Sequence, residues 1–481
     1  MSTSHVSNGV GYVAQAVANA HADYVARNPT SAKAHQDAHV HMPGGNTRTV
    51  LYSQPFPMAI KSGSGNTINS ADGASYVDFL GEFSAGLFGH SNPRIAEAVT
   101  EALKSGWNFG GESLYEKELA RKVTERFAAC GLEVVRFTNS GTEANTMAVG
   151  AALAYTGRKK VMVFTNGYHG GTFTFPVDLC RWMHAGCSGP PPCQTMNLPH
   201  EFVATPYNNV AETRAIIDGL PEDSLAAILI EPVQGSGGCR PATTEFLTFL
   251  RQKADNLGAL LVFDEVMTSR LAPAGLGAKL GIKPDLMTLG KWLAGGMTIG
   301  AFGGRRDIMQ MFDPASGSKS LMHSGTFNNN VVSMGAGIAG LDIFDAAKVE
   351  ELNARGDRLK KGVTDLLLDT GIYPEKEAQY LGDVLEVDSF ETNTRLYTGS
   401  GETSSLPPLL ISSGGSMLNV RFTGTDAALW HNLYYHHMLN RGIYLAARGF
   451  TPLSLEITDE NVDMYVGAVK EFLDKHLESL R

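Results

Sequence analysis

The sequence has little of several features that mark specialised classes of protein. Only 18% of its 481 residues are charged, and acidic residues outnumber basic ones, giving a formal net charge of −10. A chain of that sign repels a phosphate backbone, so we do not expect nucleic acid as a partner. No run of about 18 consecutive apolar residues occurs, so the sequence predicts no membrane-spanning helix. A globular enzyme or binding protein is the class that remains.

Cysteine is also scarce. Five cysteines, an odd number at low density, argue against a disulfide framework. Cys180, Cys187 and Cys193 are clustered but contain no Cys-x-x-Cys pair of the kind that ligates zinc, and three histidines between residues 35 and 41 are better explained as solvated surface. We therefore predict no metal site. The N-terminus lacks the basic start and apolar core of a secretory signal, so the expected location is cytoplasmic.

Glycine, in contrast, is abundant, and short apolar runs recur in the middle of the chain with helical patterns between many of them. Strands that alternate with helices predict an α/β fold with a mostly parallel sheet. Because the runs are almost continuously apolar, we expect a sheet that is covered on both faces. The runs are VVRF (134–137), KVMVF (160–164), AAILI (226–230), ALLVF (259–263), DLMTL (285–289) and GAFGG (300–304).

We predict three segments along the chain. An N-terminal arm with a few short strands occupies 1–80, a large α/β domain occupies 81–340, and a smaller C-terminal domain occupies 341–481. Two stretches rich in Pro, Gly, Ser and Thr, 187–199 and 392–408, are expected to be surface loops or insertions.

Polar residues follow the predicted strands, where ligands collect in folds of this kind. Ser140, Gly141 and Thr142 come after the first run and open a helix, so their backbone N–H groups suit a phosphate. Tyr168 stands between glycines after the second run and could stack on a planar ring. Taken alone, each signal has a simpler explanation: a helix cap without a ligand, and a turn with a packed tyrosine.

An acid and a lysine also stand at the ends of predicted strands. Asp264 ends a buried strand, where an acid is costly unless something positive pairs with it, although a helix cap is the simpler alternative. Lys291 follows an apolar strand within LGKWLAGG, where desolvation would make it a nucleophilic amine, although most single lysines reach to solvent. A phosphate cup, a ring stacker, an acid and a nucleophilic lysine together are what pyridoxal 5′-phosphate requires.

Eight segments, in order along the chain, resemble the class III, fold-type I pyridoxal-phosphate-dependent aminotransferases. The sequence is most similar to the branch that contains glutamate-1-semialdehyde aminomutase and β-amino-acid (β-phenylalanine) aminotransferases. This resemblance implies a large sheet domain and a smaller α+β domain formed by the N-terminal segment and the C-terminal part. The segments are MPGGNTR (42–48), FGHSNP (88–93), RFTNSGTEAN (136–145), GYHGG (167–171), ILIEPVQG (228–235), LVFDEVMTSR (261–270), PDLMTLGKWLAGGMTIGAFGGR (284–305) and HSGTFNNN (323–330).

The resemblance assigns roles to individual residues. It implies that Lys291 forms the Schiff base with the cofactor, that Asp264 keeps the pyridine nitrogen protonated, and that Tyr168 stacks on the ring. Thr326 matches a phosphate contact supplied by the neighbouring subunit, which implies a homodimer with shared active sites. The remaining cofactor contacts that it implies are Ser140, Gly141, Thr142, Glu231 and Gln234.

The expected reaction is a ping-pong transfer of an amino group from a carboxylated amine, in particular a β-amino acid, to an α-keto acid. Two arginines suit two differently placed carboxylates: Arg48, in the loop that resembles the β-amino-acid branch, and Arg448, for which a surface arginine is the simpler alternative. An aminomutase of the glutamate-1-semialdehyde type and an amine transaminase of broad specificity remain alternatives. A non-catalytic homologue is disfavoured because Lys291 and Asp264 are both present.

Overall fold

The protein is described here from a computed structural model, and its chain divides into two compact units. One unit contains the described residues up to Asn92 and those from Leu352 onward, and the other runs from Pro93 to Glu351. Most of the two predicted insertions, together with Cys180, Cys187 and Cys193, lie outside the described residues. The structure describes residues 5–171, 201–315, 320–373 and 407–480.

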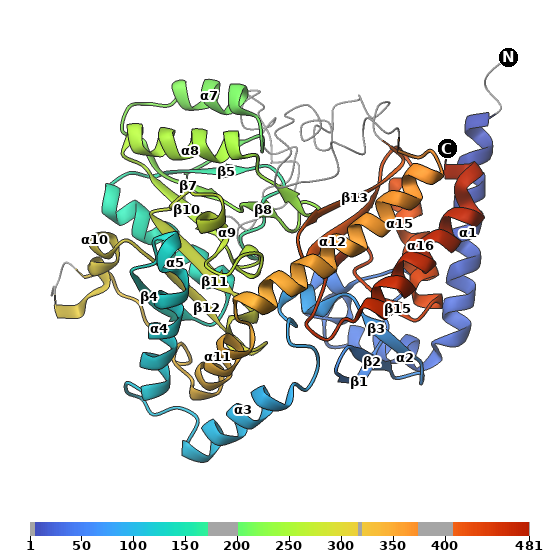
Figure 1. Cartoon of the computed structure of the whole chain (residues 1–481), viewed down its shortest axis with the longest axis horizontal. Helices are drawn as coiled ribbons and strands as arrows, with labels where there is room; N and C mark the ends of the chain where they lie inside the picture. Colours follow the sequence, from blue (N-terminus) through green and yellow to red (C-terminus); the bar gives the residue numbers. More distant parts are fainter. Residues whose placement is uncertain (1–4, 172–200, 316–319, 374–406, 481) are drawn as a thin grey trace. The chain divides into compact units, whose positions relative to one another are not determined.

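The larger unit is built on one seven-stranded sheet (Figure 1). Its strands are β4 (Val134–Thr138), β5 (Lys160–Phe164), β6 (Glu201–Thr205), β7 (Leu225–Ile230), β10 (Leu260–Asp264), β11 (Leu286–Gly290) and β12 (Gly300–Gly304). They lie in the order β4-β12-β11-β10-β7-β5-β6. Only β12 is antiparallel to its neighbours, so the predicted mostly parallel sheet is confirmed.

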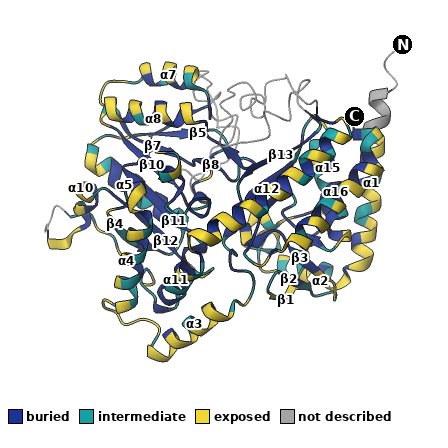
Figure 2. Ribbon diagram, in the orientation of Figure 1, coloured by how far each residue is buried: buried dark blue, intermediate teal, exposed yellow. Residues whose placement is uncertain are grey.

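Side chains alternate between the two faces of this sheet, as the period of a strand requires. Val161 and Val163 of β5 pack in one apolar cluster with α5 (Gly141–Thr156), whereas Met162 and Phe164 pack in another. The second cluster includes residues of α7 (Val210–Asp218) and α8 (Thr244–Leu257). Figure 2 shows the strands buried, and α7 and α8 exposed on their outer sides. The sheet is therefore covered on both faces, as the apolar runs predicted.

Among the remaining helices of this unit, α4 (Leu114–Phe127) and α10 (Arg306–Met309) contact the sheet, whereas α3 (Pro93–Ser105) packs on α11 (Val331–Ile343). In α11, Gly337 allows a close approach, because a Cβ there would lie 2.9 Å from the carbonyl oxygen of Leu293. This contact supports the short 3₁₀ turn η6 (Lys291–Ala294). The unit also contains α9 (Leu276–Lys279).

The smaller unit combines N-terminal and C-terminal elements, as the fold class predicted. A four-stranded sheet has the order β1-β2-β3-β15, a three-stranded sheet has the order β13-β14-β16, and an apolar cluster includes Tyr24, Ile68 and Tyr435. Among the described residues, no helix is both long and apolar enough to cross a membrane. The elements are α1 (His5–Arg27), α2 (Pro29–His39), β1 (Ile60–Ser64), β2 (Thr67–Ser70), β3 (Ser75–Asp78), α12 (Ala346–Asp369), which contains the second boundary, β13 (Leu409–Gly414), β14 (Met417–Phe422), α15 (Ala427–Asn440), β15 (Ile443–Tyr444), β16 (Phe450–Pro452) and α16 (Asp459–Leu480).

Candidate active site

Asp264 and Lys291 lie at the same edge of the large sheet. Asp264 is the last residue of β10 and is in register with Thr288 of the parallel strand β11. Lys291 directly follows Gly290, the last residue of β11, so both side chains belong to the carboxyl ends of neighbouring strands. The backbone of Lys291 is left-handed, with φ of 55°, a conformation that is costly for a residue other than glycine. Strain of this kind often accompanies a functional site.

Both oxygens of the buried Asp264 carboxylate are engaged. Oδ2 accepts a hydrogen bond from Asn145 Nδ2 at 2.8 Å and lies 2.8 Å from His169 Nδ1. Oδ1 accepts from the backbone N–H of Val266 at 3.0 Å. Asn145 is itself fixed, because its Oδ1 accepts a hydrogen bond from Thr288 Oγ1 at 2.7 Å. These contacts hold the carboxylate in one orientation.

The sequence analysis did not single out Asn145 or His169. Both lie inside segments that it quoted for the family resemblance, RFTNSGTEAN and GYHGG, and His169 directly follows Tyr168. Asn145 lies four residues after Gly141 on α5, so the helical period places it one turn into the helix. The helical spacing from Gly141 could have indicated that Asn145 lies near the start of α5. It could not indicate the contact with Asp264, which is 119 residues away in the chain.

The start of α5 forms an anion cup. Ser140 is the N-cap, and its side chain accepts a hydrogen bond from the backbone N–H of Glu143. Gly141 and Thr142 are the first two residues of the helix, whose N–H groups precede the first intrahelical bonds. Gly170 closes against this cup, since a Cβ there would lie 2.2 Å from Thr142 Oγ1. The helix cap is therefore present, and the binding of a phosphate by the same residues stays a prediction.

Tyr168, Glu231 and Gln234 lie close together. Glu231 is buried and accepts hydrogen bonds from the backbone N–H groups of Tyr168 and Gly235, at 2.9 and 3.0 Å. The side chain of Tyr168 is partly open, with 42% exposed. Gln234 donates to the carbonyl of Thr165, while its buried Oε1 has no hydrogen-bond partner within the described ranges.

Burial raises the pKa of Glu231 to about 7. The charge of Asp264 adds to this rise, whereas His169 and the two backbone N–H groups oppose it. The charge on Glu231 therefore depends on the same residues that surround Asp264.

The segment that contains Thr326 lies beside the anion cup of its own chain. Asn328 Oδ1 accepts a hydrogen bond from Asn139 Nδ2 at 2.8 Å, and Asn139 directly precedes Ser140. Thr326 itself is exposed. Its predicted contact with a second subunit stays a prediction.

The two arginines predicted to bind substrate belong to the smaller unit, where both approach the same aromatic ring. The guanidinium carbon of Arg48 lies 5.5 Å from the ring centroid of Phe83, and that of Arg448 lies 5.7 Å from it. Arg48 also forms an ion pair with Glu82. The structure thus brings Arg48 and Arg448 together, although they are 400 residues apart in the sequence.

These residues fit pyridoxal 5′-phosphate. The anion cup suits the phosphate, the fixed carboxylate of Asp264 suits a protonated ring nitrogen, and Lys291 is the amine at the adjacent strand end. The independent observation is the buried Oε1 of Gln234, which no donor among the described residues reaches, because a buried acceptor without a donor is costly unless a ligand supplies one.

A family model, aminotransferase class III, matches residues 51–393. The chain therefore belongs to the class III aminotransferases, which depend on pyridoxal 5′-phosphate. The aminotransferase activity, the cofactor and the fold-type I architecture that the sequence predicted are confirmed. The roles of individual residues remain predictions.

Both branches of the predicted family are found among the relatives. The chain is 42% identical over 463 residues to the β-phenylalanine transaminase of Variovorax paradoxus, which covers 96% of each chain. It is 33% identical over 436 residues to the glutamate-1-semialdehyde 2,1-aminomutase of Methanothermobacter thermautotrophicus, covering 90% of this chain and 96% of the relative. The solved structure of the β-phenylalanine aminotransferase from V. paradoxus matches with a TM-score of 0.84 and 40% identity, covering 97% of this chain and 98% of that one.

Proposed function

We propose that this enzyme moves the amino group of a β-amino acid to an α-keto acid by a ping-pong mechanism. The observation that carries the choice of a carboxylated donor is the pair of arginines, Arg48 and Arg448, against the ring of Phe83. The similarity to a β-phenylalanine transaminase over 96% of the chain supports a β-amino acid in particular.

In this proposal, each residue at the strand ends has a separate role in the reaction. Pyridoxal 5′-phosphate, when bound, supplies the electron sink that acidifies the amine-bearing carbon of the substrate. Lys291 would hold the cofactor through its amine and would also move a proton to and from that carbon. Asp264 keeps the ring nitrogen protonated, and Asn145 and His169 hold Asp264 in place. Tyr168 packs on the ring.

The two arginines provide separate binding sites for the carboxylates of the two substrates. One substrate cavity must accept a β-amino acid and then an α-keto acid, whose carboxylates lie at different distances from the reacting carbon. We assign Arg48 to the donor and Arg448 to the acceptor, because a guanidinium group binds a carboxylate through two parallel hydrogen bonds.

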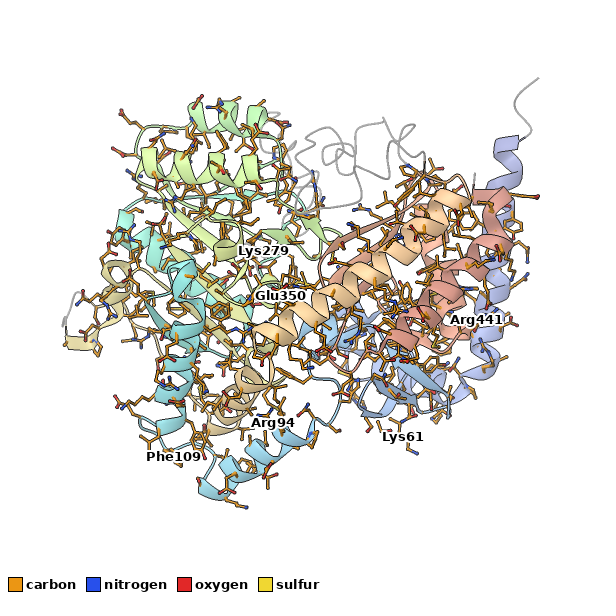
Figure 3. All side chains as sticks on the ribbon, in the orientation of Figure 1. Lys61, Arg94, Phe109, Lys279, Glu350 and Arg441 are labelled. Carbon is orange, nitrogen blue, oxygen red and sulfur yellow. The ribbon has the colours of Figure 1, made fainter. Side chains whose placement is uncertain are left out.

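We also propose a homodimer in which Thr326 contacts the phosphate of the partner. Two neighbouring segments of the larger unit expose large apolar side chains, and the backbone N–H of Val331 joins them by donating to the carbonyl of Trp107 at 3.2 Å. Large apolar side chains exposed on neighbouring segments are typical of an interface. The exposed side chains are Trp107, Phe109 (labelled in Figure 3), Leu114, Met322 and Phe327. The cytoplasmic location stays a proposal.

A donor screen tests the proposed reaction. Purified enzyme is supplied with 2-oxoglutarate or pyruvate and with one of three donors: a β-aryl-β-amino acid, its α-amino isomer, or 1-phenylethylamine. We expect the β-amino acid to give the highest kcat/KM. A higher value for 1-phenylethylamine would favour the amine transaminase. Conversion of glutamate-1-semialdehyde without any added keto acid would favour the aminomutase.

A further inference from the structure

Residues 81–84 form a turn in which every residue has a left-handed backbone. The φ angles are 48° at Gly81, 49° at Glu82, 53° at Phe83 and 76° at Ser84. Glycine adopts this conformation freely, but each of the other three residues pays a steric cost, and consecutive left-handed residues are rare. Such strain persists only where the surrounding structure enforces it, and it often marks a functional site.

Hydrogen bonds from both sides hold the turn. Asp78 Oδ1 accepts from the backbone N–H groups of Leu80 and Gly81 at 2.8 and 3.0 Å, and the N–H of Gly86 donates to the carbonyl of Gly81 at 2.9 Å. The other oxygen of Asp78 lies 2.9 Å from His90 Nε2. The backbone of the turn is therefore fixed, and only its exposed side chains are free to change position.

The side chains of Glu82 and Phe83 differ in exposure. Phe83 is buried, with 8% exposed, and the guanidinium carbons of Arg48 and Arg448 lie 5.5 and 5.7 Å from its ring centroid. The side chain of Glu82 is 55% exposed and pairs with Arg48, whose side chain is 43% exposed. The arginine assigned to the donor carboxylate thus already has a carboxylate partner from its own chain.

We propose that Glu82 is a specificity-determining residue that competes with the substrate carboxylate for Arg48. An exposed ion pair is weak, because water screens it, so an incoming carboxylate can displace Glu82 with little loss. Because the backbone is fixed, the exchange is a side-chain movement. Glu82 keeps Arg48 paired between turnovers and lowers the affinity for those ligands whose carboxylate binds Arg48. This inference depends on the proposed function, since it takes Arg48 as the donor carboxylate site.

The test compares Glu82→Gln with the wild-type enzyme. Loss of the competing charge is expected to lower the half-saturating concentration of the β-amino donor about two- to fivefold in the single-turnover half-reaction, which corresponds to the strength of an exposed pair. The inhibition constant of 3-phenylpropanoate, which lacks the amine and cannot react, is expected to fall by the same factor. That of the neutral 3-phenylpropanamide is expected to stay unchanged.

Glu471→Gln is the matched control. Glu471 pairs with Arg441 in the same unit, and their side chains are 53% and 45% exposed, so the same charge is removed from a similar pair (Figure 3 labels Arg441). We expect this variant to leave both inhibition constants unchanged. Equal effects of Glu471→Gln and Glu82→Gln on the inhibition constants would mean that the change in net charge causes them, and would overturn the proposal.

Arg48→Ala separates this inference from the function on which it rests. If Arg48→Ala leaves the inhibition constant of 3-phenylpropanoate unchanged, Arg48 is not the carboxylate site and both proposals are overturned. If Arg48→Ala weakens inhibition but Glu82→Gln has no effect, only the competing role of Glu82 is overturned. Weaker inhibition of Glu82→Gln would show that Glu82 positions Arg48 instead of competing for it.

Discussion

At the scale of single residues, the most constrained group of the candidate site is the carboxylate of Asp264. Donors from Asn145, Val266 and the imidazole of His169 surround it, and only 4% of the residue is exposed. These contacts fix the position of the carboxylate, which the proposed mechanism pairs with the ring nitrogen of the cofactor.

Asp264→Asn tests this role. The amide keeps the shape of the side chain but cannot stabilise a pyridinium charge, so we expect the amino-donor half-reaction to slow by roughly 10²–10⁴-fold. Cofactor content and the circular dichroism spectrum should remain close to those of the wild type. Stopped-flow absorbance of the cofactor with excess donor measures the rate. A near-normal rate would refute the assignment of Asp264.

The two arginines make separate predictions. Arg48→Ala is expected to weaken the half-reaction with the β-amino donor, and Arg448→Ala the half-reaction with the α-keto acid. Each loss should amount to about 2–5 kcal/mol where the site is desolvated, because a charged hydrogen-bond partner is removed. The two half-reactions are measured separately by single turnover. If both variants keep wild-type rates with carboxylated substrates, the carboxylates bind elsewhere.

His436 in α15 predicts sensitivity to acid. Burial lowers the pKa of His436 to about 4, although its Nε2 bonds the carbonyl of Gln54. Its pKa in the unfolded chain is near 6.5, so the unfolded chain binds the proton first and stability is lost as the pH falls from about 6.5 towards 4.

The expected loss from His436 is at most about 1.4 kcal/mol per pH unit in that window. His436→Gln keeps a donor for Gln54 but cannot take up a proton. Urea unfolding at pH 7 and pH 5 should therefore show a smaller loss of unfolding free energy for this variant than for the wild type. Equal losses would mean that His436 titrates normally in the folded protein.

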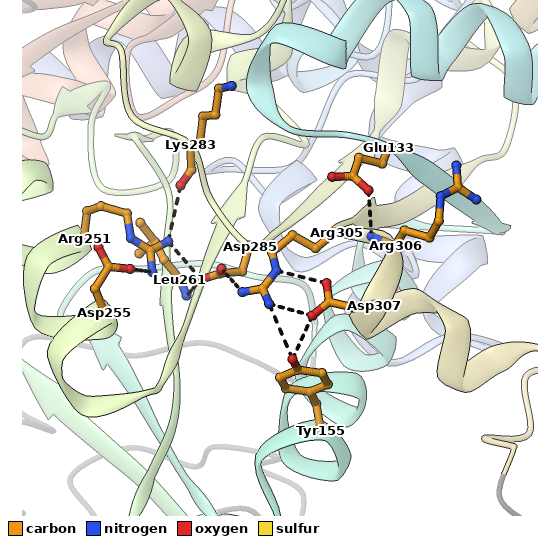
Figure 4. A network of polar contacts seen from close by, with 10 residues as sticks. All are labelled: Glu133, Tyr155, Arg251, Asp255, Leu261, Lys283, Asp285, Arg305, Arg306 and Asp307. Carbon is orange, nitrogen blue, oxygen red and sulfur yellow. Dashed lines mark hydrogen bonds and ion pairs between the residues drawn. The ribbon is translucent and has the colours of Figure 1, made fainter.

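At the scale of secondary-structure elements, β11 links two different sites. Its carboxyl end leads to Lys291, while Asp285 directly precedes its first residue. The buried Asp285 carboxylate accepts hydrogen bonds from Arg251 of α8 at 2.9 Å, from Arg305 after β12 at 2.8 Å and from the backbone N–H of Leu261 in β10 at 2.8 Å (Figure 4). One acid thus joins one helix and three strands at the end away from the candidate active site.

Asp285→Asn tests this structural role. Removing the charge from a buried group with two cationic partners is expected to cost about 2–3 kcal/mol of unfolding free energy. Asp307→Asn is the matched control, because Asp307 pairs with the same Arg305 but its side chain is 52% exposed, and its loss should stay below about 1 kcal/mol. Chemical unfolding measures both, and kcat per folded molecule should not change. Equal losses of unfolding free energy in the two variants would contradict the structural role of Asp285.

Six of the seven strands of the large sheet could be predicted from apolar runs, because each run is long enough to fill a buried strand. The sequence analysis missed β6, and it could not predict that β12 is antiparallel, because a run such as GAFGG carries no signal for direction. The same limit applies to the site. Asp264 and Lys291 stand at strand ends, which a sequence shows, whereas the contact between Asn145 and Asp264 exists only once α5 lies on the sheet.

At the scale of the whole molecule, the proposed dimer accounts for the exposed apolar segments around Trp107 and Phe327. We expect Trp107→Glu to dissociate the dimer, because a charge in an apolar interface stays unpaired. Activity should fall with the dimer, since each site would lose Thr326 of the other subunit. Sedimentation velocity and activity at the same concentration measure both. Met464→Glu, a similar change at a single exposed apolar residue of α16, is the control. An active wild-type monomer would rule out the shared site.

The proposed mechanism depends on Lys291 as the residue that binds the cofactor covalently, at the strand end next to Asp264. The most direct measurement is reduction of the purified enzyme with borohydride, followed by proteolysis and mass spectrometry. The account predicts that the reduced pyridoxyl phosphate is attached to the peptide containing Lys291, and that Lys291→Ala carries no such label. Attachment to another lysine, or the absence of a label from yellow, active enzyme, would contradict it.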